Sequence, residues 1–327
     1  MFKPRAVRAL QIAAAMFALA LAAFLISRTL GQYSLAQLGE AVAAVPPRRI
    51  IFAGAFAAAS YLCLTAFDAL GLQYAGKPLP YWQAALTSFT ALSLGHNIGL
   101  AALSSGTIRY RFYARFGLST EEVAKVILFC AVTVGLGLMM LAGVALIFRG
   151  DLGVVLVHSS RATLSVLGVT LLILPLAYLI LSTFWRARQL RLGTWSFELP
   201  APSLALSQLV IGPLNFACVA GCLYEALLAV RDVTFPDAML VYALANVATI
   251  LSHAPGGIGV IEWVVLTLLP GSMVVGALLV FRGLYYLLPL CLGAVTLGVA
   301  ELLMRPGTPY GRRKRQQGAQ RVPPLSR

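Results

Sequence analysis

Residues Ser88–Gly117 read SFTALSLGHNIGLAALSSGTIRYRFYARFG, and the interruption inside this stretch decides the fold. It begins as an apolar membrane segment and is interrupted at GHNIG. A second interruption by small residues follows at Ser104-Ser105-Gly106, and the stretch ends with Arg109, Arg111 and Arg115. A regular membrane helix does not require a His-Asn pair flanked by glycines. Unpaired backbone groups are costly in lipid, so a break here must be buried in protein or face water. Broken segments of this kind line binding sites in transporters. A kinked helix with a satisfied histidine is the alternative interpretation of the pentapeptide.

The composition of the whole chain is that of a membrane protein. Of its 327 residues, 60% are hydrophobic and only 11% are charged, and the mean hydropathy is +0.86. This balance predicts a polytopic helical membrane protein rather than a soluble domain. The net charge of +14 comes from basic residues in short loops and in the C-terminal tail, as the positive-inside rule expects. We therefore expect no nucleic-acid partner.

Apolar segments define the expected topology. Segments near the 20 residues that span a bilayer occur at 9–30, 50–75, 122–148, 162–184, 202–230 and 272–302. Two more, 82–108 and 237–270, are interrupted. We predict an all-α polytopic integral membrane protein with six spanning helices and two re-entrant broken-helix hairpins, whose tips lie near His96-Asn97 and Pro255–Gly257. The membrane domain is expected to cover residues 1–304, and residues 305–327 are expected to form a basic, disordered cytoplasmic tail.

Lysine and arginine counts set the orientation. If the N-terminus is cytoplasmic and each interrupted segment enters and leaves on one side, 18 basic residues lie inside and 6 outside. A full crossing by segment 82–108 would move the arginines at 109–115 outside. The count therefore favours re-entrant hairpins, with both termini in the cytoplasm and the chain in the cytoplasmic (inner) membrane.

The two interrupted segments also suggest an inverted repeat. In this topology, blocks 50–148 and 202–302 have opposite orientations, and each consists of a helix, a hairpin and a helix. One sequence offset, 157, relates chemically marked positions of the two blocks. The related pairs are Asp68 and Glu225, His96 and His253, Gly99 and Gly256, and Lys125 and Arg282. Inverted repeats around a midplane site are a common transporter design.

Two motifs carry a family resemblance. The run GHNIGLAALSSGTIRYRFYARFGLS and the later run SHAPGGIGVIE at 252–262 resemble the membrane (flippase) region of lysylphosphatidylglycerol synthases and its small stand-alone homologues. The resemblance covers roughly residues 10–302. In the full-length synthases a soluble aminoacyl-transfer domain follows the membrane region. This chain ends at Arg327, so the resemblance implies the stand-alone form without that transferase activity.

Three charged residues lie within apolar segments: Asp68, Glu225 and Arg282. Charges inside a membrane are costly, so such residues are usually functional or paired. The alternative is that each lies near a helix end and snorkels to the interface. We expect Asp68 and Glu225 to be protonated or to have polar partners, with Lys125 and Arg282 as candidates for that role.

The break at Pro255–Gly259 offers a second candidate site. Exposed amides at the restarting helix would suit a phosphate or carboxylate. Glu262, on that helix, either pairs with a cation or caps the helix start. A dinucleotide fingerprint is excluded, because no strand precedes the glycines.

A basic-aromatic cluster follows the first break: Arg109, Tyr110, Arg111, Tyr113 and Arg115. Arginine forms forked hydrogen bonds to phosphate, so the cluster could hold an anionic head group. Topological anchoring is the alternative.

Three functions remain open. The first is a lipid translocase that moves a phospholipid or lipid-linked anion, as the resemblance implies. The second is an intramembrane head-group transferase, which the absence of HExxH and nucleophile-elbow motifs disfavours. The third is a non-catalytic accessory subunit of a lipid-modifying enzyme. We expect no catalytic residue, cofactor or metal, and we expect membrane lipids, particularly anionic phospholipid, as partners; a homo-oligomer and a separate lipid-modifying enzyme remain open. The candidate substrate-binding residues are Asp68, His96, Asn97, Arg109, Arg111, Arg115, Glu225, His253, Gly256, Gly257, Glu262 and Arg282.

Overall fold

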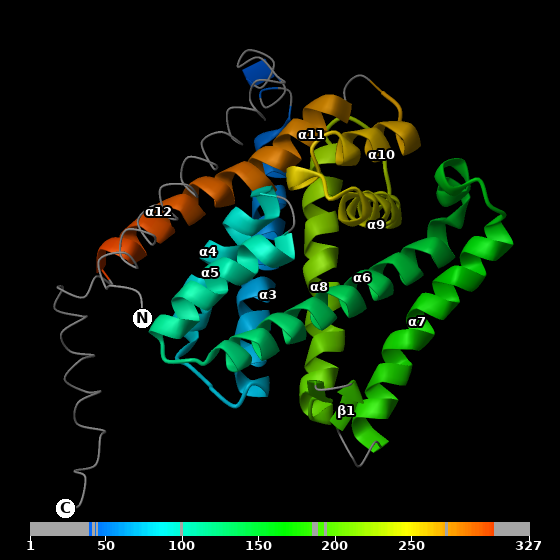
Figure 1. Ribbon diagram of the computed structural model, residues 1–327. Helices are drawn as coiled ribbons and strands as arrows, with labels where there is room; N and C mark the ends of the chain where they lie inside the picture. Colours follow the sequence, from blue (N-terminus) through cyan, green and yellow to red (C-terminus); the bar gives the residue numbers. More distant parts are fainter. Residues whose placement is uncertain are drawn as a thin grey trace, which may run out of the picture.

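A computed structural model describes residues 39–40, 43, 45–98, 101–184, 189–192, 195–271 and 274–303. This part of the chain is almost entirely helical, as the composition predicts (Figure 1). The α-helices are α3 (Pro47–Tyr74), α4 (Tyr81–Ile98), α5 (Ala101–Arg115), α6 (Thr120–Val157), α7 (Arg161–Phe184), α8 (Pro202–Leu227), α9 (Phe235–Ser252), α10 (Val260–Leu268), α11 (Val274–Arg282) and α12 (Leu288–Leu303). A 3₁₀ turn, η1 (Pro255–Gly257), separates α9 from α10, and a π-helical segment, η2 (Gly283–Leu287), joins α11 to α12.

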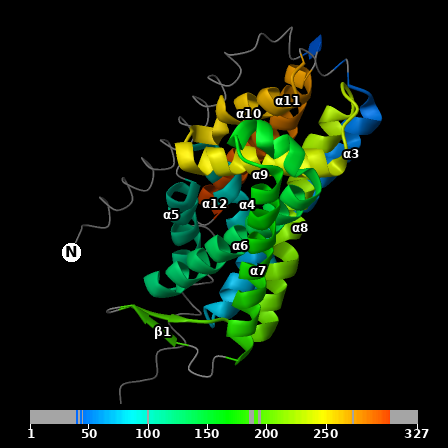
Figure 2. The same ribbon diagram turned by 90° about the vertical axis from the view of Figure 1, so that its right-hand side faces the viewer.

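One small element departs from the all-α expectation. Strands β1 (Gln189–Leu192) and β2 (Trp195–Glu198) form a two-stranded antiparallel ribbon between α7 and α8, with Gln189 opposite Glu198. Nothing in the apolar pattern signals a ribbon this short. It lies outside the helical bundle (Figure 2).

Six helical stretches in the described chain are long and apolar enough to cross a membrane: α3, α6, α7, α8, α9 and the continuous run Val274–Leu302. Five coincide with predicted spans. The predicted span at 9–30 lies outside the described residues. The sixth candidate, α9, is the first limb of the interrupted segment 237–270, so the six helices are not the six that the sequence predicts.

Local sequence signals explain where several helices begin. At the start of α6, Ser119 and Glu122 form a capping box: the Ser119 hydroxyl accepts from the Glu122 amide at 3.2 Å, and the Glu122 carboxylate accepts from the Ser119 amide at 2.7 Å. Such a box satisfies two of the amides that a helix start leaves unpaired. Helices α3 and α8 begin with Pro47 and Pro202, since proline is tolerated in the first turn.

Helices α3 and α8 form the antiparallel centre of the bundle. They lie side by side in both ribbon views and run in opposite directions (Figures 1 and 2). At the middle of this pair, the Ser60 hydroxyl donates to the Asn215 carbonyl oxygen at 2.7 Å. At one end, Arg49 of α3 pairs with Glu225 of α8 at 2.8 Å. Segments related by an inverted repeat must run in opposite directions, and these two helices do.

The two interrupted segments start from opposite ends of this pair. The first, α4–α5, is the first broken hairpin: Lys77, just before it, lies 3.5 Å from Glu122, just after it. The second broken hairpin is α9–η1–α10: Arg231, before α9, donates to the carbonyl of Pro270, after α10, at 2.7 Å. Each hairpin therefore begins and ends at the same end of the bundle. Because Lys77 follows α3 and Arg231 follows the antiparallel α8, these ends are opposite.

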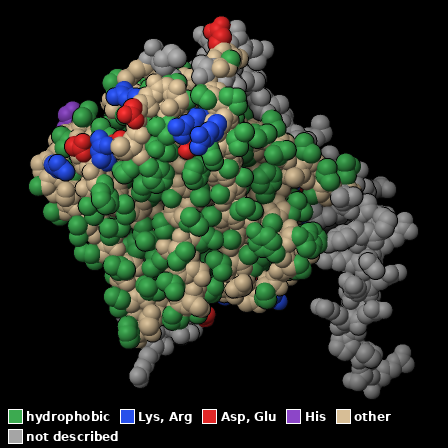
Figure 3. All heavy atoms as spheres, turned by 180° about the vertical axis from the view of Figure 1, so that it is seen from behind, with side chains coloured by type: hydrophobic (Ala, Val, Ile, Leu, Met, Phe, Trp, Pro, Cys, Tyr) green, Lys and Arg blue, Asp and Glu red, His purple; other side chains and the backbone are tan. Residues whose placement is uncertain are grey.

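The surface is divided into an apolar belt and charged ends. Seen from behind, hydrophobic side chains cover most of the face, and charged side chains gather along its upper edge with a few at the lower margin (Figure 3). Helix α7 exposes many large apolar side chains, among them Val166, Ile173, Leu176 and Ile180. An exposed apolar surface this broad is expected for a protein surrounded by lipid. Which end faces the cytoplasm stays a prediction.

Candidate functional site: two broken hairpins and their ion pairs

The first broken hairpin is tightly closed near its tip. A Cβ atom added to Gly95 of α4 would lie 2.8 Å from the Ser105 Cβ of α5, closer than two carbon atoms can approach. The Ser104 hydroxyl donates to the Gly95 carbonyl at 3.4 Å. The small residues Gly95, Ser104 and Ser105 therefore allow helices α4 and α5 to pack together.

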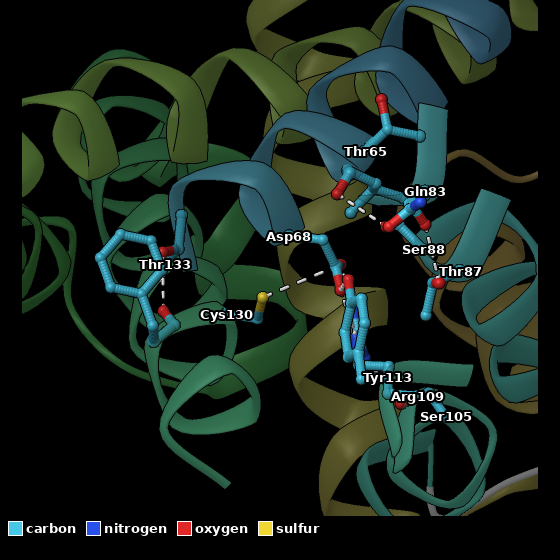
Figure 4. Close-up of polar contacts among 12 residues, drawn as sticks. Thr65, Asp68, Gln83, Thr87, Ser88, Ser105, Arg109, Tyr113, Cys130 and Thr133 are labelled. Carbon is cyan, nitrogen blue, oxygen red and sulfur yellow. Dashed lines mark hydrogen bonds and ion pairs between the residues drawn. The ribbon is translucent and has the colours of Figure 1, made fainter. Parts of the chain in front are cut away.

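A buried ion pair fixes this hairpin to α3 (Figure 4). Asp68 is fully buried, and Arg109 of α5 donates to it through Nε at 2.9 Å and Nη2 at 2.7 Å. The Tyr113 hydroxyl donates to the same carboxylate at 2.7 Å, and the Cys130 thiol lies 3.9 Å from it. Arg109 also donates from Nη1 to the Ser105 hydroxyl at 3.2 Å. Both charges are thus compensated inside the protein.

This arrangement corrects one expectation about Asp68. Its partner is Arg109, whereas Lys125 pairs with Glu121 one turn earlier on α6, at 3.0 Å, where the glutamate is largely exposed. The prediction that Asp68 has a polar partner is confirmed. The sequence offset could not identify that partner, because Arg109 reaches Asp68 only after the hairpin folds back on α3.

The turn in the second broken hairpin depends on backbone conformations that favour glycine. Gly256, Gly257 and Gly259 have φ values of 59°, 62° and 83°, and His253, which ends α9, is also left-handed at 54°. Side chains other than glycine rarely adopt such values. The run of glycines after Pro255 therefore lets the chain reverse within a few residues.

Arg282 holds this turn in place. Its Nη1 donates to the Gly256 carbonyl at 2.8 Å and its Nη2 to the Gly257 carbonyl at 2.9 Å. The same guanidinium pairs with Glu262, at 2.8 Å through Nη2. Glu262 in turn accepts from the Gly259 amide at 2.8 Å, at the start of α10. Both interpretations of Glu262 are therefore confirmed, and its carboxylate fills the helix start where an anionic ligand was expected.

The tips of the two hairpins meet in the interior. A Cβ atom on Gly256 would lie 3.8 Å from both Cα and O of Asn97, at the end of α4. The side-chain amide of Asn97 donates through Nδ2 to the backbone carbonyl of Tyr286 in η2 at 3.4 Å. The Tyr61 hydroxyl donates to the backbone carbonyl of Tyr285 at 3.4 Å. A π-helical segment displaces its carbonyl groups from regular helical bonding and is frequent at functional sites. We call this meeting point of α4, η1 and η2 the tip junction.

His96 lies next to the tip junction. Its ring stacks on Tyr285, with centroids 6.3 Å apart and planes at 21°, and lies 6.4 Å from the ring of Tyr61. Its Nδ1 atom is buried and has no hydrogen-bond partner among the described residues. The satisfied histidine of the kinked-helix interpretation is therefore not found.

The three arginines after the first break do not form one cradle. Arg109 is 4% exposed and faces Asp68, while Arg111 and Arg115 pair with Glu301 of α12 at 3.0 and 2.8 Å. On a helix, residue 109 lies on a different face from residues 111 and 115. The expected cluster is thus split between a buried ion pair and a partly exposed group of two arginines and one glutamate.

Glu225 and His253 lie away from the tip junction. Glu225 pairs with Arg49 near the start of α3 and with neither of the two candidate partners, Lys125 and Arg282. His253 is exposed, and its Nδ1 lies 3.1 Å from the Leu251 carbonyl. Although the sequence offset relates these residues to Asp68 and His96, their surroundings differ.

The sequence did not reveal the contacts of several site residues. Tyr113 and Cys130 lie against Asp68, and Ser105 bonds to its partner Arg109. Tyr61 and Tyr285 lie against His96. Tyrosines and small polar residues are common in membrane helices, so composition alone does not distinguish them. The clearest available signal was the Tyr285-Tyr286 pair, three and four residues beyond Arg282. No group of three or more histidines, cysteines, aspartates and glutamates that could hold a metal occurs among residues 39–303 as far as they are described.

These features define a polytopic helical membrane protein in which two interrupted helical segments meet in the interior, one held by a buried ion pair and the other by a partly buried one. Residues 15–293 match the family described as the lysylphosphatidylglycerol synthase TM region, and the chain belongs to that family.

Two relatives extend the match over most of their length. "Uncharacterized protein slr0712" of Synechocystis sp. is 32% identical over 271 residues, 81% of this chain and 82% of the relative. "Inner membrane protein YbhN" of Escherichia coli is 31% identical over 246 residues, 72% of this chain and 75% of the relative.

Proposed function

We propose that this protein is a lipid translocase that moves a phospholipid or lipid-linked anion across the cytoplasmic membrane. The observation that carries the proposal is the contact between Gly256 and Asn97, where two hairpins from opposite ends of the bundle meet. In this proposal both hairpins are re-entrant, and the two blocks 50–148 and 202–302 form an inverted repeat. Such designs place a cargo site between the tips, reached alternately from either side.

The family and the interior chemistry support this function. The chain belongs to a family described by the membrane region of a lipid-synthesising enzyme. Its buried charges are already paired, so they shape a polar interior without exposing an uncompensated charge to lipid. At the end of α5, two arginines face one glutamate. The basic residues at this end favour an anionic phospholipid as the partner and a cytoplasmic location for this end and both termini.

A crosslink across the tip junction tests the proposal. In a background without the five native cysteines, the variant N97C/G256C carries two thiols at positions whose backbones are close enough for a disulfide. We reconstitute it in liposomes that contain a fluorescent glycerophospholipid and measure the accessibility of the label on each leaflet. Oxidation should stop translocation and reduction should restore it. The single variants N97C and G256C, oxidised in the same way, are the matched controls.

The same vesicles separate the alternative functions. Mass spectrometry of the recovered lipid would reveal a modified head group if the protein is a transferase. A protein that neither moves nor modifies any lipid would fit an accessory subunit and would contradict the proposal. Unchanged translocation in the crosslinked protein would show that the tips need not separate, which would also contradict it.

A further inference from the structure

His96 differs from the charged residues predicted to bind cargo. Asp68 pairs with Arg109, and Glu262 pairs with Arg282, within the protein. The Nδ1 atom of His96, by contrast, is buried and lacks a hydrogen-bond partner in the described chain. Native proteins rarely bury an unpaired polar atom, because it loses its bonds to water and gains nothing in return. An atom of this kind next to a proposed cargo path is a candidate ligand-binding atom.

The surroundings of His96 hold its ring in a defined orientation. Tyr285 stacks against one face and Tyr61 lies beside it, and both tyrosines are themselves hydrogen-bonded, to Ser60 and to the Tyr285 carbonyl. His96 as a whole residue is partly exposed, whereas its Nδ1 atom is buried. In the proposed translocation, separation of the tips is what lets a head group reach this atom.

The charges near the tips indicate which chemical group is recognised. Arg109 is neutralised by Asp68 with two hydrogen bonds, and Arg282 is neutralised by Glu262. Each pair is formally neutral, so neither arginine offers an uncompensated positive charge to a phosphate. An imidazole that stacks on one aromatic ring and lies beside another can, in its neutral form, donate or accept a hydrogen bond with a neutral partner.

We propose that His96 hydrogen-bonds an uncharged hydroxyl group of the lipid head group as the cargo passes the tip junction. This inference rests on the proposed translocation. It assigns recognition of the head group to one neutral side chain and leaves the buried ion pairs as positioning residues. The phosphate of the lipid is then not the group that the junction selects.

A variant that keeps the ring and removes its nitrogens tests this role. H96F retains stacking on Tyr285, so its melting temperature in detergent should equal or exceed that of the wild type. Translocation of a phospholipid with a glycerol head group should fall about tenfold, the effect of one lost hydrogen bond. The control H158N changes an exposed histidine at the left-handed end of α6, a conformation that asparagine tolerates.

A comparison of head groups decides whether the bond is to a hydroxyl. The wild type should move the glycerol lipid faster than a choline lipid, whose head group has no hydroxyl, and H96F should lose this preference. An equal loss for both lipids would overturn the proposal, because it would indicate a bond to the shared phosphate. A lower melting temperature for H96F would also overturn it, since it would make the histidine structural.

The failure of this inference can be told apart from failure of the proposed function. If the wild type moves neither lipid, the translocase proposal fails, and this inference fails with it. If the wild type moves the glycerol lipid and H96F moves it equally well, only the role of His96 is overturned.

Discussion

The two broken hairpins are both anchored by an arginine and a carboxylate, yet they use the guanidinium differently. Among the described residues, Arg109 of the first hairpin bonds to two side chains: the carboxylate of Asp68 and the hydroxyl of Ser105. Arg282 reaches the second hairpin from outside it and bonds to two backbone carbonyls as well as to Glu262. The first pair joins two regular helices, and the second stabilises an irregular turn.

This difference follows from the kind of break in each segment. Helices α4 and α5 lie close together at Gly95, so the hairpin needs only to be tied to α3. The second break contains a turn whose carbonyl groups are not bonded within a regular helix, and buried backbone groups must find partners. Arg282 supplies them. Removal of each arginine or its partner should therefore have a different consequence.

The largest effect is expected for the first pair. D68N removes the charge that compensates Arg109 and leaves a buried guanidinium, which typically costs about 3–5 kcal/mol of stability. We expect a corresponding loss in the free energy of unfolding, measured in detergent by chemical denaturation. The double variant D68L/R109L, which removes both charges, should recover much of it. If D68N keeps wild-type stability but loses translocation, the carboxylate serves the cargo and the structural interpretation is wrong.

An intermediate, more local effect is expected for the second pair. R282K keeps the positive charge but cannot form the forked bonds that reach both carbonyls and Glu262 together. We expect a loss of about 1.5–3 kcal/mol, the usual contribution of hydrogen bonds to charged groups. Amide hydrogen exchange should increase at 256–262 and remain unchanged in α3. Equal increases in both regions would show that the two pairs are not independent anchors.

The smallest effect is expected for the pair at the end of the bundle. The Arg49 side chain is 36% exposed, whereas that of Glu225 is 11% exposed. The solvated arginine keeps the pair near the range of exposed ion pairs, about 0–1 kcal/mol. E225Q should therefore change the free energy of unfolding by less than about 1 kcal/mol, and less still at high salt. A loss as large as that of D68N would mean that the two acids related by the sequence offset are equivalent after all.

Much of this architecture was predictable because hydrophobic length is a strong constraint in lipid. The spans at 50–75, 122–148, 162–184, 202–230 and 272–302 all correspond to helices. The breaks near His96-Asn97 and Pro255–Gly257 were also found, because glycine and proline mark places where regular bonding ends. The β1–β2 ribbon was not predicted, and neither was α9 as a separate helix of spanning length.

Partners across the interior could not be predicted in the same way. Lys125 and Arg282 were the candidate partners of Asp68 and Glu225, because the sequence offset relates the two bases as it relates the two acids. The actual pairs, Asp68 with Arg109 and Glu225 with Arg49, join residues 41 and 176 positions apart. The charge of a residue shows that it needs a partner in the membrane. The identity of that partner depends on which opposite charge the folded chain brings close to it.

The sequence by itself determined the membrane class, the position of the helices and the two breaks, since these depend on local hydrophobicity and backbone preference. Tertiary structure alone decided that Arg109 turns inward while Arg111 and Arg115 bond to Glu301, that Glu262 occupies its own helix start, and that His96 keeps an unpartnered nitrogen. The physical reason is that hydrogen bonds and ion pairs act over about 3 Å. Which groups come within that range depends on how helices far apart in the sequence pack against one another.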